Sequence, residues 1–140
     1  MSTKALDVKR HLKTLYDGMP MVASDHVQVS FSWPGKNLEK RWVMIGDIKW
    51  TKSEWVTNRS RQEEFTIEVS FSVQLPGSAE DAEAYVIALA ADFEAALKAD
   101  ASLGGLAVTS GYEPSELKSW PIDKLYEAQF KTEVSASCRP

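Results

Sequence analysis

One stretch of strict alternation between apolar and polar residues constrains the fold more than any other feature of this chain. In the segment 63–75, every second residue from Phe65 onward is apolar and the residues between them are polar. The apolar series is Phe65, Ile67, Val69, Phe71, Val73 and Leu75. Because side chains of a strand point alternately to its two faces, this period predicts a long strand with one buried and one polar face. Pro76-Gly77 predicts the turn that ends it.

Four other segments also have strand character. The last, 125–138, alternates as clearly as the first, and its predicted buried face is Tyr126, Ala128, Phe130, Thr132, Val134, Ala136 and Cys138. Segment 27–33 predicts a shorter strand with an inward face of Val27, Val29, Phe31 and Trp33. Segment 41–50 predicts another, in which Gly46 indicates a bulge or bend. The remaining strand is expected at 106–113.

Two segments have helical periodicity instead. In 4–16, Ala5, Val8, Leu12 and Leu15 form one apolar stripe. A longer helix is expected after Ser78, whose side chain is placed to cap it with Asp81 three residues later. Its predicted buried stripe is Ala82, Tyr85, Val86, Leu89, Phe93, Ala96 and Leu97.

The resulting element order is α-β-β-β-α-β-β. Strands joined by short turns favour an α+β fold with a mostly antiparallel sheet of about five strands and two helices packed on one face. The chain has 140 residues, a common size for one domain, and no linker-like segment interrupts it. We therefore expect a single domain over residues 1–140.

The sequence offers few groups for catalysis or metal binding. It has two histidines, His11 and His26, without partners at ligand spacing, and one cysteine, Cys138. It contains no nucleophile elbow and no phosphate-binding glycine motif. Adjacent strand residues such as Glu63 and Glu64 point to opposite faces and would not form an acid/base pair. We expect no catalytic residues, no metal and no cofactor.

Nothing in the sequence predicts a membrane partner either. No apolar run approaches the roughly 18 residues that a spanning helix needs. The first residues carry scattered charges rather than the apolar stretch of a signal peptide, so a cytoplasmic setting is expected.

Charge is distributed unevenly along the chain. Residues 29–61 carry seven basic and three acidic groups, whereas residues 62–140 carry five basic and fourteen acidic groups. The basic segment also holds four of the five tryptophans, and three of them, Trp42, Trp50 and Trp55, lie close together in its second half. Residues 51–62 are expected to form an extended hairpin or a loop, and Trp55 is the best candidate for an exposed anchor. The predicted assembly interface is Lys49, Trp50, Lys52, Trp55, Arg59 and Arg61.

Two alternatives remain open at this point. Trp42 and Trp50 equally fit a packed core. The polar faces of strands 63–75 and 125–138 equally fit a solvated surface or the wall of a water-filled channel.

The order of these motifs resembles a known family. A short helix is followed by I-G-D-I-K-W (Ile45 to Trp50), by R-x-E-E leading into the alternating strand (Arg61 to Leu75), and by a capped alanine-rich helix. A-D-A-S-L-G-G-L (Ala99 to Leu106) and an alternating last strand complete the set, in which D-x-S-L-G-G (Asp100 to Gly105) is the most specific piece. Together they look like the tail terminator, or tail completion, proteins of long-tailed bacteriophages, particularly those of actinobacterial phages and prophages.

This resemblance implies a structural role in the virion tail. Such proteins form a hexameric ring that caps the tail tube, stops its polymerisation and joins it to the head–neck connector, and they have no enzymatic activity. The implied partners are other copies of the chain, the major tail tube protein, the head–neck connector and, transiently, DNA passing through the ring. A neck connector or stopper of the same particle, and a small-molecule-binding α+β domain, are the alternative functions.

Overall fold

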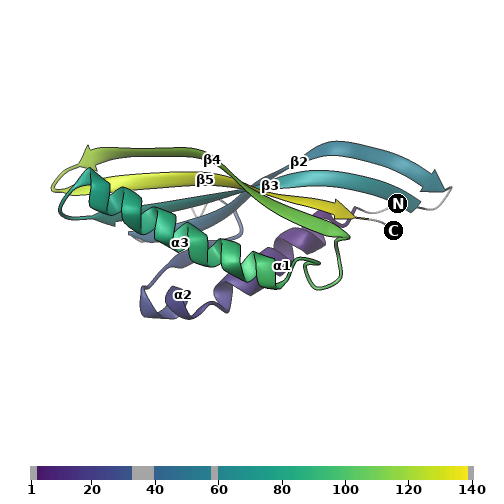
Figure 1. Cartoon of the computed structure of the whole chain (residues 1–140), viewed down its shortest axis with the longest axis horizontal. Helices are drawn as coiled ribbons and strands as arrows, with labels where there is room; N and C mark the ends of the chain where they lie inside the picture. The colour runs from purple at the N-terminus through teal and green to yellow at the C-terminus, as the bar shows by residue number, and fades with distance from the viewer. Residues whose placement is uncertain (1–2, 33–39, 58–59, 139–140) are drawn as a thin grey trace.

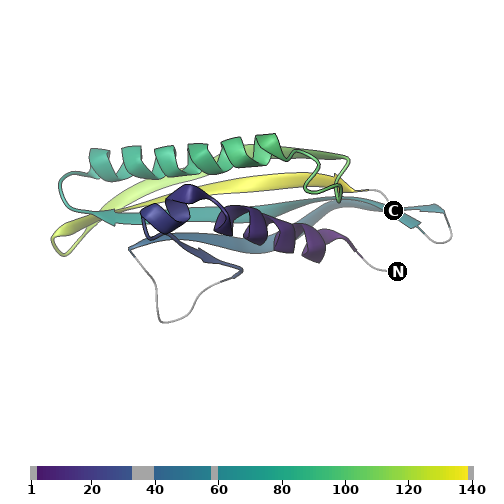
Figure 2. The same cartoon turned by 90° about the horizontal axis from the view of Figure 1, so that it is seen from below.

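The computed structural model describes residues 3–32, 40–57 and 60–138, with residues 52–57 and 60–61 described by their backbone alone. One twisted sheet forms one layer, and the helices form the other (Figure 1). In Figure 2, the two longer helices lie in front of the same face of the sheet, side by side. The predicted α+β class, with the helices on one face, is therefore confirmed.

The sheet has five strands in the order β1-β2-β3-β5-β4. Their bounds are β1 Gln28–Ser30, β2 Arg41–Thr57, β3 Ser60–Leu75, β4 Thr109–Ile122 and β5 Leu125–Cys138. β3 lies at the centre, antiparallel to both β2 and β5, and β5 is antiparallel to β4. Only β1 pairs in parallel, with β2, so the sheet is mixed although mostly antiparallel as predicted.

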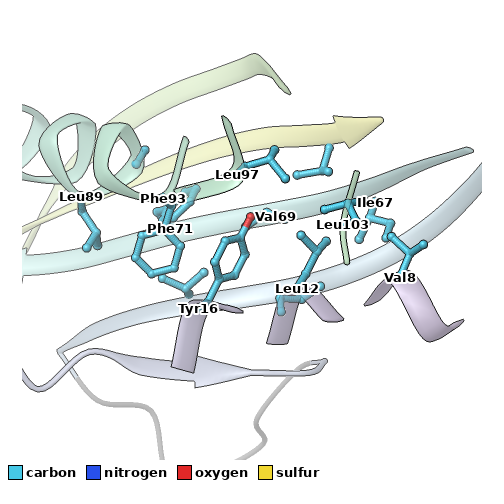
Figure 3. Close-up of a cluster of buried hydrophobic side chains, with 14 of the residues drawn as sticks. Val8, Leu12, Tyr16, Ile67, Val69, Phe71, Leu89, Phe93, Leu97 and Leu103 are labelled. Carbon is cyan, nitrogen blue, oxygen red and sulfur yellow. The ribbon is translucent and has the colours of Figure 1, made fainter. Parts of the chain in front are cut away.

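The core lies between the sheet and the helices. Five apolar residues of β3, from Phe65 to Val73, are 0–1% exposed. Phe71 meets Phe93 of α3 (Ala79–Ala99) edge-on at 5.2 Å between ring centroids. Tyr16 of α1 (Ala5–Asp17) packs on the same Phe93 ring at 4.5 Å (Figure 3). The two helices and the central strand thus meet at the ring of Phe93. The burial of the apolar residues of β3 confirms the alternation predicted for this strand.

The helices begin and end close to the predicted positions. They are α1 Ala5–Asp17, α2 Pro20–Ser24 and α3 Ala79–Ala99. Ser78 caps α3 as expected, since its hydroxyl accepts a hydrogen bond from the amide of Asp81 at 3.1 Å. The short α2 was not predicted. In α1, Tyr16 rather than Leu15 completes the fully buried stripe, and in α3 Ala90 is buried although it was not predicted to be.

The turn between α2 and β1 is fixed by a small polar cluster. The hydroxyl of Tyr85 in α3 donates a hydrogen bond to a carboxylate oxygen of Asp25 at 2.7 Å. The guanidinium of Arg41 donates to the backbone carbonyl of Asp25 and lies over the Tyr85 ring. Burial, reinforced by the hydrogen bond to Asp25, raises the pKa of Tyr85 to about 12. The phenol therefore stays protonated as a donor that ties α3 to this loop.

Two strand predictions need correction. β1 covers only residues 28–30, and the side chain of Phe31 is 36% exposed under the ammonium of Lys9 rather than inward. Trp33 lies outside the described residues. β4 was predicted at 106–113 but begins at Thr109 and continues to Ile122, through Pro114 and Pro121. Proline is tolerated there because β4 is an edge strand.

The bulge at Gly46 is confirmed. Ile45 pairs with Val69 and Ile48 with Ile67, so β2 has one residue more than β3 in this interval. The extended-hairpin alternative for residues 51–62 is also confirmed for the described backbone, because β2 continues to Thr57 and β3 starts at Ser60.

Replacing Phe71 by alanine is expected to lower the free energy of unfolding by about 3–5 kcal/mol, because it empties a fully buried aromatic position. Phe31→Ala serves as the matched control, and its exposed ring is expected to contribute about 1 kcal/mol or less. Urea denaturation of both variants measures the difference. Equal losses would show that the core is not centred on β3.

Candidate assembly surfaces

The sheet leaves backbone hydrogen-bonding groups unpaired along both edges. On one side, β1 covers only Trp42 to Met44 of β2, so the described part of β2 from Ile45 onward pairs with β3 but has no strand on its outer side. On the other side, β5 is the one strand among the described residues that pairs with β4. Unpaired strand edges are templates for pairing with another chain. The two edges lie on opposite sides of one sheet, as a subunit that joins other copies would require.

The predicted interface residues are distributed along the β2–β3 hairpin, which extends past the helices in both views (Figures 1 and 2). Lys49 and Trp50 are both exposed but point to opposite faces, since Lys49 pairs with Thr66 on the polar face and Trp50 with Phe65 on the helix-covered face. The structure therefore does not bring these two side chains together. Their role in assembly stays a prediction.

The other predicted residues are placed only in part. Lys52 pairs with Glu64, and Trp55 with Arg61, along the backbone of the hairpin. Arg59 lies outside the described residues. Trp42 is buried, as a packed position requires, although its partner Ser72 places it on the face opposite the helices, whereas Trp50 is 48% exposed.

A buried carboxylate holds the base of the hairpin against the first helix. Glu63, 3% exposed, accepts hydrogen bonds from the hydroxyl of Thr3 at 2.7 and 2.9 Å and from the amide of Lys4 at 2.7 Å. It also accepts one from the indole N–H of Trp50 at 3.1 Å. A carboxylate at the start of α1 is favoured by the helix dipole. Glu63 therefore orients Trp50, a role that the adjacent pair Glu63-Glu64 did not suggest.

The turn after α3, which holds the most specific motif of the sequence, also contacts α1. One carboxylate oxygen of Asp100 contacts the ring of His11, and the other accepts the amide of Gly104 at 3.0 Å. Leu103 is fully buried with a φ of 52°, and Gly104 has a φ of 68°. A Cβ on Gly104 would lie 2.8 Å from the His11 ring. The motif thus has a structural explanation in joining α1 to the end of α3.

The face of the sheet opposite the helices is polar and rich in carboxylates. Among the residues whose side chains the structure describes, the strand registers place six glutamates and three lysines on this face: Glu64, Glu68, Glu113, Glu116, Glu127, Glu133, Lys49, Lys118 and Lys131. Glu68, Glu133 and Glu113 lie directly opposite one another across three strands. Like charges in such a row repel unless water screens them, so this face suits a hydrated surface.

The described residues offer no group of three or more histidine, cysteine or acidic side chains arranged to hold a metal ion. Within the same part of the chain, none of the helices combines the length and apolar character of a membrane span.

No family model and no curated protein matches this chain by sequence. In structure, it is similar to a chain of a solved assembly described as the virion of a native gene transfer agent (GTA) particle. The TM-score is 0.46 at 10% sequence identity, over 92% of this chain and 93% of that chain. A likeness at this level does not establish a shared function.

Gly104→Ala is expected to lower the free energy of unfolding by about 1–3 kcal/mol, because the new methyl group meets His11 and the backbone is left-handed. Gly105→Ala is the matched control, since Gly105 has a φ of 87° but a Cβ added there would meet no atom within 4 Å. Thermal denaturation should show the larger loss at Gly104. Equal losses would mean that contact with His11 contributes nothing.

The Asp100 contact also predicts a dependence on pH. The hydrogen bond to His11, followed by that to Gly104, lowers the pKa of Asp100 in the folded chain. A lowered carboxyl pKa stabilises the fold above the unfolded pKa, and this contribution is lost as pH falls through the folded pKa. The stability advantage of the native chain over Asp100→Asn should therefore shrink between about pH 5 and pH 3. Urea denaturation across this range measures it, and a constant advantage would contradict the assignment.

Proposed function

We propose that this chain is a structural subunit of a long-tailed, phage-like particle, in which copies assemble into a ring at the end of the tail tube. The ring would stop polymerisation of the tube and present the surface that joins the head–neck connector. In this proposal the chain has no enzymatic activity and needs no cofactor. Its place is the junction between tail and neck of the virion.

The observation that carries the proposal is the pair of open sheet edges. A contact between two different edges is heterologous, and such contacts generate a closed ring when the rotation between copies brings the last copy back to the first. The order of the sequence motifs resembles that of tail terminator proteins, and this resemblance is the reason for proposing a ring at the end of a tail tube. The resemblance favours six copies.

The polar face of the sheet fits the inner wall of such a ring. Six glutamates against three lysines on its described part give this face a negative balance. Binding of proteins to DNA depends on neutralising phosphates with basic side chains, so an acidic wall binds DNA weakly. Weak binding suits a channel through which DNA slides during ejection.

Two other functions remain to be compared. A neck connector or stopper would use the same open edges, and the described residues favour neither station in the particle. A small-molecule-binding domain is less consistent with the fold. Most of the predicted apolar stripe of α3 is buried against the sheet, where Phe93 fills the space between Phe71 and Tyr16.

Deleting the gene from its phage or prophage distinguishes the two stations. If the chain is a terminator, electron microscopy should show tails of uncontrolled length, because tube growth is no longer stopped. Complementation with the native gene is the control. Tails of normal length that fail to join heads would contradict the terminator role and support a neck connector.

Purified protein provides an independent test. Native mass spectrometry is expected to show a ring, with six copies favoured, at high concentration or after addition of tail tubes. A strict monomer under both conditions would contradict the proposal.

A further inference from the structure

A shallow apolar groove runs between α3 and the edge strand β4 on the helix-covered face. Its two adjoining hollows have volumes of about 160 and 210 Å³ and share Glu94 and Tyr112. The first is lined mainly by apolar groups, and Ile87 within it is 45% exposed. Its lining includes Ile87, Ala91, Glu94, Tyr112 and Pro114. Ile87 therefore extends the apolar lining of the groove to the molecular surface, next to the outer edge of β4.

The opposite edge of the sheet carries a side chain suited to such a groove. Trp50 is half-exposed, yet its indole N–H is held by Glu63 and its ring packs near Phe65 at 6.4 Å between centroids. An aromatic side chain that is already oriented loses little freedom when it binds, which is why tryptophan is common among binding hot spots.

Trp50 and the groove lie on the same face of the sheet at its two opposite edges. Trp50 pairs with the buried Phe65, and Tyr112 in the groove pairs with the buried Val134. When copies are arranged side by side, the β2 edge of one meets the β4 edge of the next, and Trp50 then faces the groove of its neighbour. Because β2 and β4 run in opposite directions within one sheet, the meeting strands are antiparallel.

Charge also favours this pairing. The hairpin over residues 48–61 has four basic and one acidic residue, a net charge of +3. The segment from α3 to the end of β4, residues 79–122, has two basic and eight acidic residues, a net charge of −6. Opposite charges on the two meeting surfaces steer the encounter of the copies and disfavour contact between two acidic grooves.

Prolines in β4 explain why side chains matter at this contact. Pro114 and Pro121 have no amide hydrogen, so β4 cannot donate along its whole length. A ladder of backbone hydrogen bonds alone would be interrupted at these prolines. A tryptophan seated in the adjacent groove stabilises the contact without using the missing amide hydrogens.

We propose that the groove between α3 and β4 binds a second copy of this chain, through Trp50 and the β2 edge of that copy. This contact rests on the proposed ring and names the surfaces that form it. It also gives the two edges different roles: the β2 edge inserts Trp50, and the β4 edge carries the groove that receives it.

The test compares assembly of four variants by native mass spectrometry over a range of concentrations. Trp50→Ala removes the anchor, and Ala91→Arg fills the groove from an exposed helix position. Each should raise the concentration needed for assembly by about 30-fold or more, the effect of losing one hot spot. Ile87→Glu is a second groove variant, and Leu6→Ala, at an exposed position outside the groove, is the control that should assemble normally.

The double variant Trp50→Ala with Ala91→Arg decides whether both residues act in one contact. If they do, it should assemble little worse than either single variant, because each change already removes the same interaction. Unchanged thermal unfolding of the monomers shows that the effects are on assembly.

Three outcomes would overturn the inference. If the native chain assembles and the groove and Trp50 variants assemble equally well, the contact is wrong and the proposed function stands. Additive losses in the double variant would place the two residues in separate contacts and also overturn it. If the native chain never assembles, even with tail tubes, the proposed function fails and the contact fails with it.

Discussion

The alternation along β3 is the constraint on which the rest of the structure depends. β3 is the central strand, so its backbone pairs on both sides, with β2 and with β5. Its apolar face provides the surface on which α1 and α3 pack, and a shift of one residue in register would turn that face away from them. The same alternation leaves a polar face without helices. One strand therefore fixes which side of the molecule is core and which side meets water.

The edges of the sheet follow from this arrangement. With the helices on one face only, the fold covers neither the β2 edge beyond Met44 nor the outer edge of β4 in the described part of the chain. Natural proteins usually shorten, charge or cover such edges. Here β4 carries two prolines, whereas the open part of β2 has none. Because the two edges differ in this way, the proposed contact joins the β2 edge of one copy to the β4 edge of the next.

Much of the fold could be predicted from sequence because its strongest elements have clear periods. β5 was predicted with its observed bounds, and Ser78 was identified as the cap of α3. β4 was predicted too short because proline normally ends a strand, and only its edge position permits Pro114. β1 was predicted too long because local alternation does not reveal where pairing with β2 stops.

The candidate site was less predictable, since it depends on contacts between distant segments. Glu63 meets Thr3 across 60 positions, and no local pattern signals that contact. The turn from Asp100 to Gly105 was singled out by its motif, but its contact with His11 required the packing of α1 against α3. The groove beside β4 combines a helix and a strand that sequence periodicity treats separately.

Hydrogen exchange of the backbone amides, measured by mass spectrometry in the monomer and in the assembled state, tests the central claim most directly. The account predicts that assembly slows exchange in β2 beyond Ile45 and in the described edge of β4, while the amides of β3 change little because they are already paired. Slowed exchange confined to the inner strands or to the helices, with both edges unchanged, would contradict it.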